Sequence, residues 1–138
     1  MNDLIADTHS IIWYLFDPPR LSKPAKLALV AAAQNGTIFI SAITIVEVIY
    51  LSEKKSFPYP GVFPHLLAVL DDPNEPIEML PLTLNVARGM DRILRNEVPD
   101  MPDRIIAATA VEHKLRLVSV DSDIRNSASP AALVSVIW

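Results

Sequence analysis

The chain has 138 residues, of which 51% are hydrophobic and 20% charged, with a formal net charge of -4 and no cysteine. This length suffices for one domain with its own core, and so many apolar residues exclude an intrinsically disordered chain. The lack of cysteine excludes disulfides and thiolate metal sites, and the negative charge argues against a protein that grips nucleic acid through a basic surface alone.

Short apolar runs alternate with segments of helical periodicity along the whole chain. In chain order we expect strand 4–6, helix 8–16, helix 22–36, strand 38–40, helix 41–55, helix 63–70, strand 77–80, helix 84–97, a last helix beginning near Asp103, strand 117–120 and strand 133–137. Ser22 and Ser41 are favoured N-caps, and Gly36 and Pro99 are expected helix stops. This alternation predicts the α/β class, with a mainly parallel central sheet and helices on both faces.

Nothing in the sequence indicates export, membrane insertion or a second domain. Residues 1–4 begin neither a basic leader nor a long apolar stretch, so we expect no signal peptide, no membrane span and a cytosolic protein. We find no repeat, low-complexity tract or linker. Residues 1–138 are therefore expected to form a single domain.

Four acidic residues fall at one edge of the predicted sheet. Asp7 ends the first strand and Asp121 ends strand 117–120. Glu47 lies less than two turns into a helix, and Asp103 opens another. Right-handed strand-helix-strand units start each helix at the carboxyl edge, where open α/β sheets bind their ligands. We therefore expect these four side chains to share one crevice.

Ionised carboxylates held this close repel one another, so such a group is stable only if cations bind among them. Oxygen ligands without cysteine or paired histidines suit Mg²⁺ or Mn²⁺. These ions polarise a phosphodiester, activate an attacking water and neutralise a leaving oxygen. They would also let a negatively charged protein receive phosphate.

Four segments share the order and spacing of a known family. They are Ile5-Ala6-Asp7-Thr8-His9 with Trp13, Asp17-Pro18, Leu21-Ser22 and Ala25; Ser41-Ala42-Ile43-Thr44-Ile45-Val46-Glu47; Pro102-Asp103-Arg104-Ile105-Ile106-Ala107-Ala108-Thr109-Ala110; and Leu117-Val118-Ser119-Val120-Asp121-Ser122-Asp123. At these residues the chain resembles the PIN domain, and within it the toxin ribonucleases of bacterial VapBC toxin-antitoxin modules. The likeness covers nearly the whole chain. Ser119, Met101 and Ile124 depart from the family's commoner residues, and none of these departures removes a carboxylate.

The resemblance implies a single PIN-like nuclease domain and a metal-dependent endoribonuclease, with transfer RNA as one candidate substrate. It also implies a homodimer and a cognate antitoxin that inserts a segment near the acidic pocket. The implied metal ligands are Asp7, Glu47, Asp103 and Asp121. Thr8 would orient the first carboxylate or its metal-bound water, and Asp123 is a candidate supplementary ligand.

Each acidic residue also has a purely structural interpretation. Asp103 can belong to a capping arrangement with Asp100 and be favoured by the helix dipole. Asp7 can cap the following helix, and Asp121 can belong to a polar turn. This alternative is weaker for Glu47, the only charged residue between Gly36 and Glu53, because charged groups are seldom buried without a partner. Joint placement at one sheet edge favours the metal site.

Several basic and aromatic residues leave both a functional and a structural role open. Arg88, Arg92 and Arg95 lie at helical spacing and would contact RNA or an antitoxin, or simply form a solvated face. Arg104 would reach the pocket rim or pair with a carboxylate. His9 is a candidate for substrate contact or proton transfer, although a packed histidine is commoner on an apolar helix.

The loop with Phe57 and Tyr59, together with Phe63, is either a docking surface for an antitoxin or second subunit, or a rigid loop over its own core. Trp13 is expected to be a core residue.

Three other functions compete with the nuclease. A receiver-like signalling module would need adjacent acidic residues after the first strand and a lysine after the last, whereas Asp7 is followed by Thr8 and no lysine follows Val120. An aspartyl phosphatase would need a second aspartate two residues after Asp7. A non-catalytic partner-binding domain would not need all four carboxylates.

Overall fold

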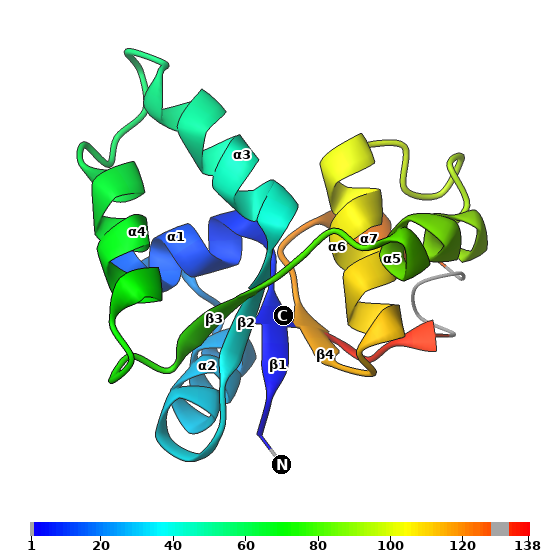
Figure 1. The fold of residues 1–138 in the computed structure, drawn as a ribbon, viewed down its shortest axis with the longest axis horizontal. Helices are drawn as coiled ribbons and strands as arrows, with labels where there is room; N and C mark the ends of the chain where they lie inside the picture. The colour runs from blue at the N-terminus through cyan, green and yellow to red at the C-terminus, as the bar shows by residue number, and fades with distance from the viewer. Residues whose placement is uncertain (1, 128–132) are drawn as a thin grey trace.

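Five parallel strands of the described residues form one sheet, in the order β3-β2-β1-β4-β5 (Figure 1). The computed structural model describes residues 2–127 and 133–138. Because neighbouring strands all run in the same direction, each return to the sheet needs a crossover connection, and helices supply these. The strands are β1 (Leu4–Ala6), β2 (Ile38–Ser41), β3 (Ile77–Leu80), β4 (Arg116–Val118) and β5 (Val136–Ile137).

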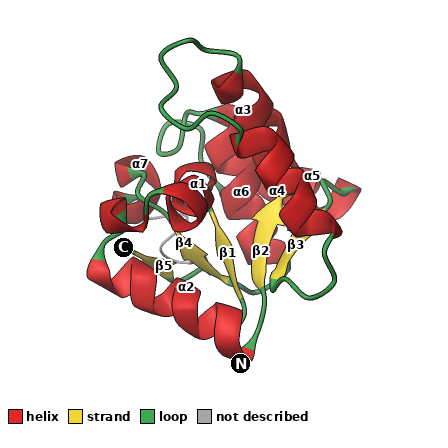
Figure 2. Cartoon of the chain, turned by 90° about the vertical axis from the view of Figure 1, so that its left-hand side faces the viewer, coloured by secondary structure: helices red, strands yellow, loops and turns green. Residues whose placement is uncertain are grey.

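Helices cover both faces of this sheet, as Figure 1 and Figure 2 show. The buried side chains of α1, α2 and α4 pack on one face, and those of α5, α6 and α7 on the other. No helix of the described residues has the length and apolar character needed to span a bilayer. The helices are α1 (Thr8–Phe16), α2 (Lys23–Asn35), α3 (Ala42–Ser52), α4 (Val62–Asp71), α5 (Leu84–Gly89), α6 (Met101–Glu112) and α7 (Ser122–Asn126), with short 3-10 helices η1 (Pro18–Arg20) and η2 (Met90–Arg92).

Alternation along the central strands divides the core into two apolar clusters. Leu4 and Ala6 of β1 face the helices α1, α2 and α4, whereas Ile5 between them faces α5 and α6. All three side chains are fully buried. A strand buried on both faces needs apolar residues at every position, which explains why the strands of this chain are continuous apolar runs. The predicted α/β class is confirmed.

The order of the strands places a topological switch beside β1. The chain moves from β1 to β2 and β3 on one side, and then returns to add β4 and β5 on the other side. In open parallel sheets, ligands bind outside the carboxyl ends of the strands at this kind of position. Asp7 and Asp121 follow β1 and β4, so two of the predicted site residues flank the switch.

The helix expected over residues 84–97 is wrong beyond Gly89. The chain forms α5 only to Gly89 and then the single turn η2. The guanidinium of Arg104 donates to the carbonyls of Met90 and Ile93 at 2.9 and 3.0 Å, and the Met90 carbonyl also accepts from the backbone N–H of Ile93 at 3.0 Å, so these bonds hold the segment as a single turn. Ile93 and Val98 are fully buried and fix the irregular segment on the core.

Other element predictions need smaller corrections. The helical spacing of Leu27, Val30 and Ala31 predicts that they form the apolar face of α2, which is wrong. Leu27 is 62% exposed, and the helix packs through Ala25, Leu29 and Ala32. Both sets have helical spacing, so periodicity alone does not choose between them. The helix near Asp103 starts at Met101, and it is not the last one, since the expected polar turn after Asp121 is the helix α7. Of the strand expected at 133–137, only Val136–Ile137 is extended in the sheet.

Candidate active site

Asp7 is the buried centre of the candidate site. It directly follows β1, and its backbone N–H donates to the carbonyl of Val118 in β4 at 2.9 Å. Its carboxylate accepts from the backbone N–H of Ser10 at 2.9 Å, which caps α1, and from the hydroxyl of Ser119 at 2.7 Å. Only 4% of Asp7 is exposed. Burial raises the pKa of this carboxyl, and the hydrogen bonds offset part of the increase.

Ser119 connects the first and fourth predicted site residues. Besides donating to Asp7, its buried hydroxyl accepts from the backbone N–H of Asp121 at 3.1 Å. The side chain of Asp121 in turn accepts from the N–H of Ile124 at 3.0 Å and caps α7. The Ser119 hydroxyl therefore fixes the position of Asp7, which follows β1, relative to Asp121, which follows β4.

Glu47 reaches the site from α3 and is held by a threonine. Thr8 donates its hydroxyl hydrogen to Oε1 of Glu47 at 2.5 Å, and its oxygen lies 3.1 Å from the hydroxyl of Thr44. Thr8 and Thr44 are both buried, and Glu47 is half-buried. Burial raises the pKa of Glu47, the Thr8 hydrogen bond opposes this, and negative charge on Asp100 and Asp7 adds to it.

Asp103 carries the largest electrostatic perturbation of the site. It lies in the first turn of α6, where its backbone N–H donates to the capping carboxylate of Asp100 at 3.2 Å. Burial, together with the charge of Asp121 and a side-chain hydrogen bond to it, raises the pKa of Asp103 to about 8. Near neutral pH, Asp103 therefore retains a proton that it shares with Asp121.

The four carboxylates behave as one electrostatic group. Asp7 and Asp121 both raise the pKa of Asp103, and Asp7 also raises that of Glu47. Among residues 2–127 and 133–138, however, no three His, Cys, Asp or Glu side chains already stand where they could hold a metal ion together. Repulsion opposes a tighter arrangement of bare carboxylates, and a cation among them would remove that repulsion.

The donor chemistry of this group fits a hard divalent cation. Every nearby acidic or hydroxyl group offers oxygen, and neither cysteine nor a pair of histidines competes for the role. Mg²⁺ and Mn²⁺ prefer such ligands. Three carboxyls with raised pKa values at one sheet edge are also the expected signature of a functional site.

The structure places the remaining candidates at varying distances from this centre. Thr8 donates its hydroxyl hydrogen to Glu47, which differs from the expected orientation of Asp7, whereas the expected contact with a metal-bound water stays a prediction. Asp123 lies exposed in the first turn of α7. The guanidinium of Arg104 donates to the backbone carbonyls of Met90 and Ile93, and these contacts differ from both expected roles, at the pocket rim and in a pair with a carboxylate.

The basic and aromatic residues outside the acidic group are either exposed or packed against the core. His9 is exposed and contacts the ring of Trp13 with centroids 5.6 Å apart, so the packed interpretation of His9 is wrong. Trp13 is 8% exposed and belongs to the core, as expected. Phe57, Tyr59 and Phe63 pack against the core, as the rigid-loop interpretation requires. The solvated-face interpretation agrees with the exposure of Arg88, Arg92 and Arg95.

Sequence reasoning gave no site role to three residues that shape the centre. Ser119 bonds to Asp7, Thr44 contacts Thr8, and Asp100 acts electrostatically on both Glu47 and Asp103. Ser119 precedes Asp121 by two positions, and Thr44 precedes Glu47 by three. This closeness to a predicted ligand is the sequence signal that could have indicated their roles. Asp100 was interpreted only as a cap, and it is both the cap of α6 and a fifth negative charge near the site.

Comparisons with known sequences agree on one family. A sequence profile described as PIN domain matches residues 4–129. The chain is also 29% identical to "Ribonuclease VapC22" of Mycobacterium tuberculosis over 138 residues, which covers all of both chains.

Solved structures share the fold. A chain in the crystal structure of VapBC2 from Rickettsia felis, bound to a DNA fragment from their promoter, matches with a TM-score of 0.67 and 18% identity, covering 97% of this chain and 96% of that one. A toxin-antitoxin complex from Klebsiella pneumoniae matches with a TM-score of 0.62 and 23% identity, covering 91% of this chain and 93% of that one.

Proposed function

The chain belongs to the PIN domain family, and from that premise we propose that it is a Mg²⁺- or Mn²⁺-dependent endoribonuclease that hydrolyses RNA phosphodiester bonds. The observation that supports this proposal is the electrostatic coupling among Asp7, Glu47, Asp103 and Asp121 beside the switch point of the sheet. A relative named as a ribonuclease, similar along its whole length, supports the same reaction class. Receiver-like and aspartyl-phosphatase functions are set aside by the family and by the residues that follow β1.

The proposed ligands are the carboxylates of Asp7, Glu47, Asp103 and Asp121. A divalent cation bound among them would activate the attacking water, offset charge on the phosphate and neutralise the leaving oxygen. Hydrogen bonds within the chain hold the proposed ligands in place. Ser10 and Ser119 fix the two oxygens of Asp7, and Thr8 fixes one oxygen of Glu47.

Asp103, whose pKa is raised by the neighbouring Asp121, supplies the part of the site that responds to protonation. The proton that Asp103 retains near neutral pH must leave before both carboxylates can act as ligands. Cation binding and proton release are thus coupled. The remaining candidate, Asp123, stands exposed at the start of α7, from where it would supplement the ligands only through water or after movement.

We further propose that the protein is a toxin neutralised by a cognate antitoxin. The support is the name of the similar ribonuclease and the shared fold with chains from toxin-antitoxin structures. Transfer RNA is the first candidate substrate, and an enzyme acting on it would work in the cytoplasm. We also expect a homodimer. Exposed apolar side chains on α3 could form part of its interface, since Val46 is 46% and Tyr50 is 69% exposed.

Cleavage of a total transfer-RNA pool tests the reaction. Antitoxin-free wild type should cut the pool with Mg²⁺ or Mn²⁺ and stop when chelator is added. Asp7→Asn and Asp103→Asn should lose cutting, because each change removes a charged ligand. Asp91→Asn is the matched control, since Asp91 is exposed on η2 and outside the acidic group, and it should cut like wild type.

Two results would contradict the nuclease. The first is RNA cleavage that persists in chelator or in both site variants. Such cleavage would come from a contaminant or from another mechanism. The other is no cutting of transfer, ribosomal or messenger RNA by wild type together with no specific Mn²⁺ binding, which would indicate a partner-binding domain.

A further inference from the structure

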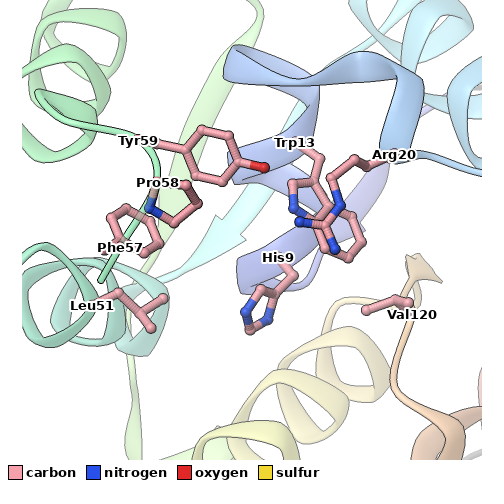
Figure 3. Close-up of a pocket in the computed structure, with 8 residues that line it drawn as sticks. All are labelled: His9, Trp13, Arg20, Leu51, Phe57, Pro58, Tyr59 and Val120. Atoms are coloured by element: carbon pink, nitrogen blue, oxygen red, sulfur yellow. The ribbon is translucent and has the colours of Figure 1, made fainter. Parts of the chain in front are cut away.

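A cavity of about 340 Å³ lies directly beside the acidic group (Figure 3). Its walls come from α1, from the segment just after α1, from the loop that follows α3, and from the residue before Asp121. His9 adjoins Thr8, and Val120 adjoins Asp121, so the cavity and the carboxylates share neighbouring residues on two elements. Its volume lies in the range of small-molecule sites, roughly 300–1,000 Å³.

Aromatic rings stand on two opposing sides of this cavity. His9 and Trp13 form one side, with ring centroids 5.6 Å apart. Phe57 and Tyr59 form the other side, with centroids 5.5 Å apart and ring planes at 78°. Figure 3 shows the two pairs facing each other across open space. The Trp13 ring is only 8% exposed and contacts the Arg20 guanidinium and the Trp138 ring, so a flat aromatic ligand would stack on His9 and on Phe57 or Tyr59, as unpaired bases stack on aromatic faces of proteins.

Contacts behind the rings fix both walls. The Tyr59 hydroxyl donates to a carboxylate oxygen of Asp17 at 2.9 Å. On the other wall, the guanidinium carbon of Arg20 lies 4.6 Å from the centre of the Trp13 ring, in cation-π contact. Rings already held in place lose little conformational entropy when a ligand binds.

The charge of the cavity selects an anionic aromatic ligand. Its described lining includes the Arg20 guanidinium and the His9 imidazole, and it includes no carboxylate. Arg20 is exposed, so the N–H groups not used in stacking are accessible to a phosphate. A purely apolar protein segment would gain nothing from these two groups, whereas a nucleotide presents both a ring and a phosphate.

We propose that this cavity binds one unpaired base of the RNA, next to the phosphodiester held at the carboxylates, with Arg20 on a neighbouring phosphate. The proposal deepens the ribonuclease function and depends on it. A base held there would bring the adjacent bond to Asp7 and its partners, and the fit of that base would set sequence preference.

Binding of single-stranded RNA to non-cleaving protein tests the cavity. The full chain with Asp103→Asn is titrated with short oligomers in which one adenine at a time is replaced by 2-aminopurine, whose fluorescence falls on stacking. We expect quenching at one position of the oligomer. Adding Phe57→Leu removes a ring but keeps apolar bulk, and should weaken binding roughly fivefold to thirtyfold and abolish the position-specific quenching.

Matched variants separate a lost base contact from a damaged fold. Phe63→Leu is the control for Phe57→Leu, because Phe63 is also half-buried against the core but does not line the cavity. It should change RNA affinity less than about twofold. Arg20→Gln should reduce the slope of log affinity against log salt concentration by about 1, the value for one lost phosphate contact. Melting curves of each variant verify folding.

Three outcomes distinguish this proposal from its competitors. If wild type cuts RNA while Phe57→Leu and Arg20→Gln keep affinity, quenching and base preference, the cavity proposal is overturned and the nuclease stands. If the same variants spare RNA binding but weaken the complex with a purified antitoxin, the cavity belongs to a protein segment and the proposal is equally overturned. If no form binds or cuts RNA, both proposals fail together.

Discussion

Replacing Asp103 by asparagine should stabilise the metal-free protein at neutral and alkaline pH. The folded protein holds this carboxyl among like charges, with a pKa raised to about 8. In the unfolded chain the ordinary value of 3.8 applies. Because the folded pKa is the higher one, ionising Asp103 destabilises the fold above pH 4, increasingly so up to about pH 8. Asparagine has a similar shape and carries no such charge.

The size of the effect follows from the pKa. At about 1.4 kcal/mol per pKa unit, the ceiling at pH 7 is about 4 kcal/mol. Because the side chain is only part-buried, solvent screening reduces this, and we expect about 1–2 kcal/mol. Loss of a carboxylate from the first turn of α6 opposes the gain by about 0.3–1 kcal/mol through the helix dipole. These ranges leave a net gain of about 0–1.7 kcal/mol at pH 7, so the increase in Tm should not exceed about 6 °C.

Thermal unfolding in chelator at pH 8 and pH 5 measures this directly. The gain should be larger at pH 8 than at pH 5, where wild-type Asp103 is mostly protonated. Asp91→Asn, the exposed control, should shift Tm by less than about 2 °C at both pH values. A Tm of Asp103→Asn at or below that of wild type at pH 8, or a gain that does not shrink at pH 5, would refute the assignment of Asp103 to a repelling group.

Three further changes test individual contacts. Ser119→Ala removes a hydrogen bond to buried Asp7 and should destabilise the fold by about 1–3 kcal/mol, with a loss that grows as pH rises and Asp7 ionises, as shown by melting curves. Thr8→Val frees Glu47 and should lower metal-dependent kcat/KM about 10- to 100-fold, as shown by cleavage of a fluorogenic RNA. It also leaves the buried Thr44 hydroxyl without this partner, so it should destabilise the fold by about 1–3 kcal/mol. Arg104→Met should destabilise the fold by about 1–3 kcal/mol and speed amide hydrogen exchange across residues 90–99.

The controls for Ser119→Ala and Arg104→Met use exposed residues of the same type. Ser122→Ala on α7 and Arg92→Met on η2 should stay within about 0.5 kcal/mol of wild type. If Ser119→Ala and Ser122→Ala change stability equally, the hydrogen bond of Ser119 to Asp7 does not stabilise the fold. Unchanged cleavage by Thr8→Val would mean that Glu47 does not need its hydroxyl partner.

Local signals in the sequence were sufficient for much of the fold. Ser22 and Ser41 cap the helices that follow them, as their side chains and positions predict. Asp7 and Asp121 reach one edge because parallel strands share a direction, which needs no knowledge of side-chain contacts. Proximity of the acidic residues could therefore be predicted from the order of strands and helices.

Contacts between distant segments could not be predicted in this way. The Ser119 bond to Asp7 depends on the register between β1 and β4, which are far apart in the sequence. The end of α5 depends on Arg104, a residue of another helix that occupies the carbonyl of Met90. The exposure of Leu27 depends on which of two equally spaced faces meets the sheet. In each case tertiary packing decides between local options that are similarly favourable.

The central claim, that these carboxylates form one cation site, is tested most directly by calorimetric titration with Mn²⁺. Measured near pH 7 in two buffers of different ionisation enthalpy, wild type should bind Mn²⁺ and release close to one proton, because Asp103 is largely protonated before binding. Binding should disappear in Asp7→Asn and persist in Asp91→Asn. Equal Mn²⁺ binding by all three proteins, or binding without proton release, would contradict the claim.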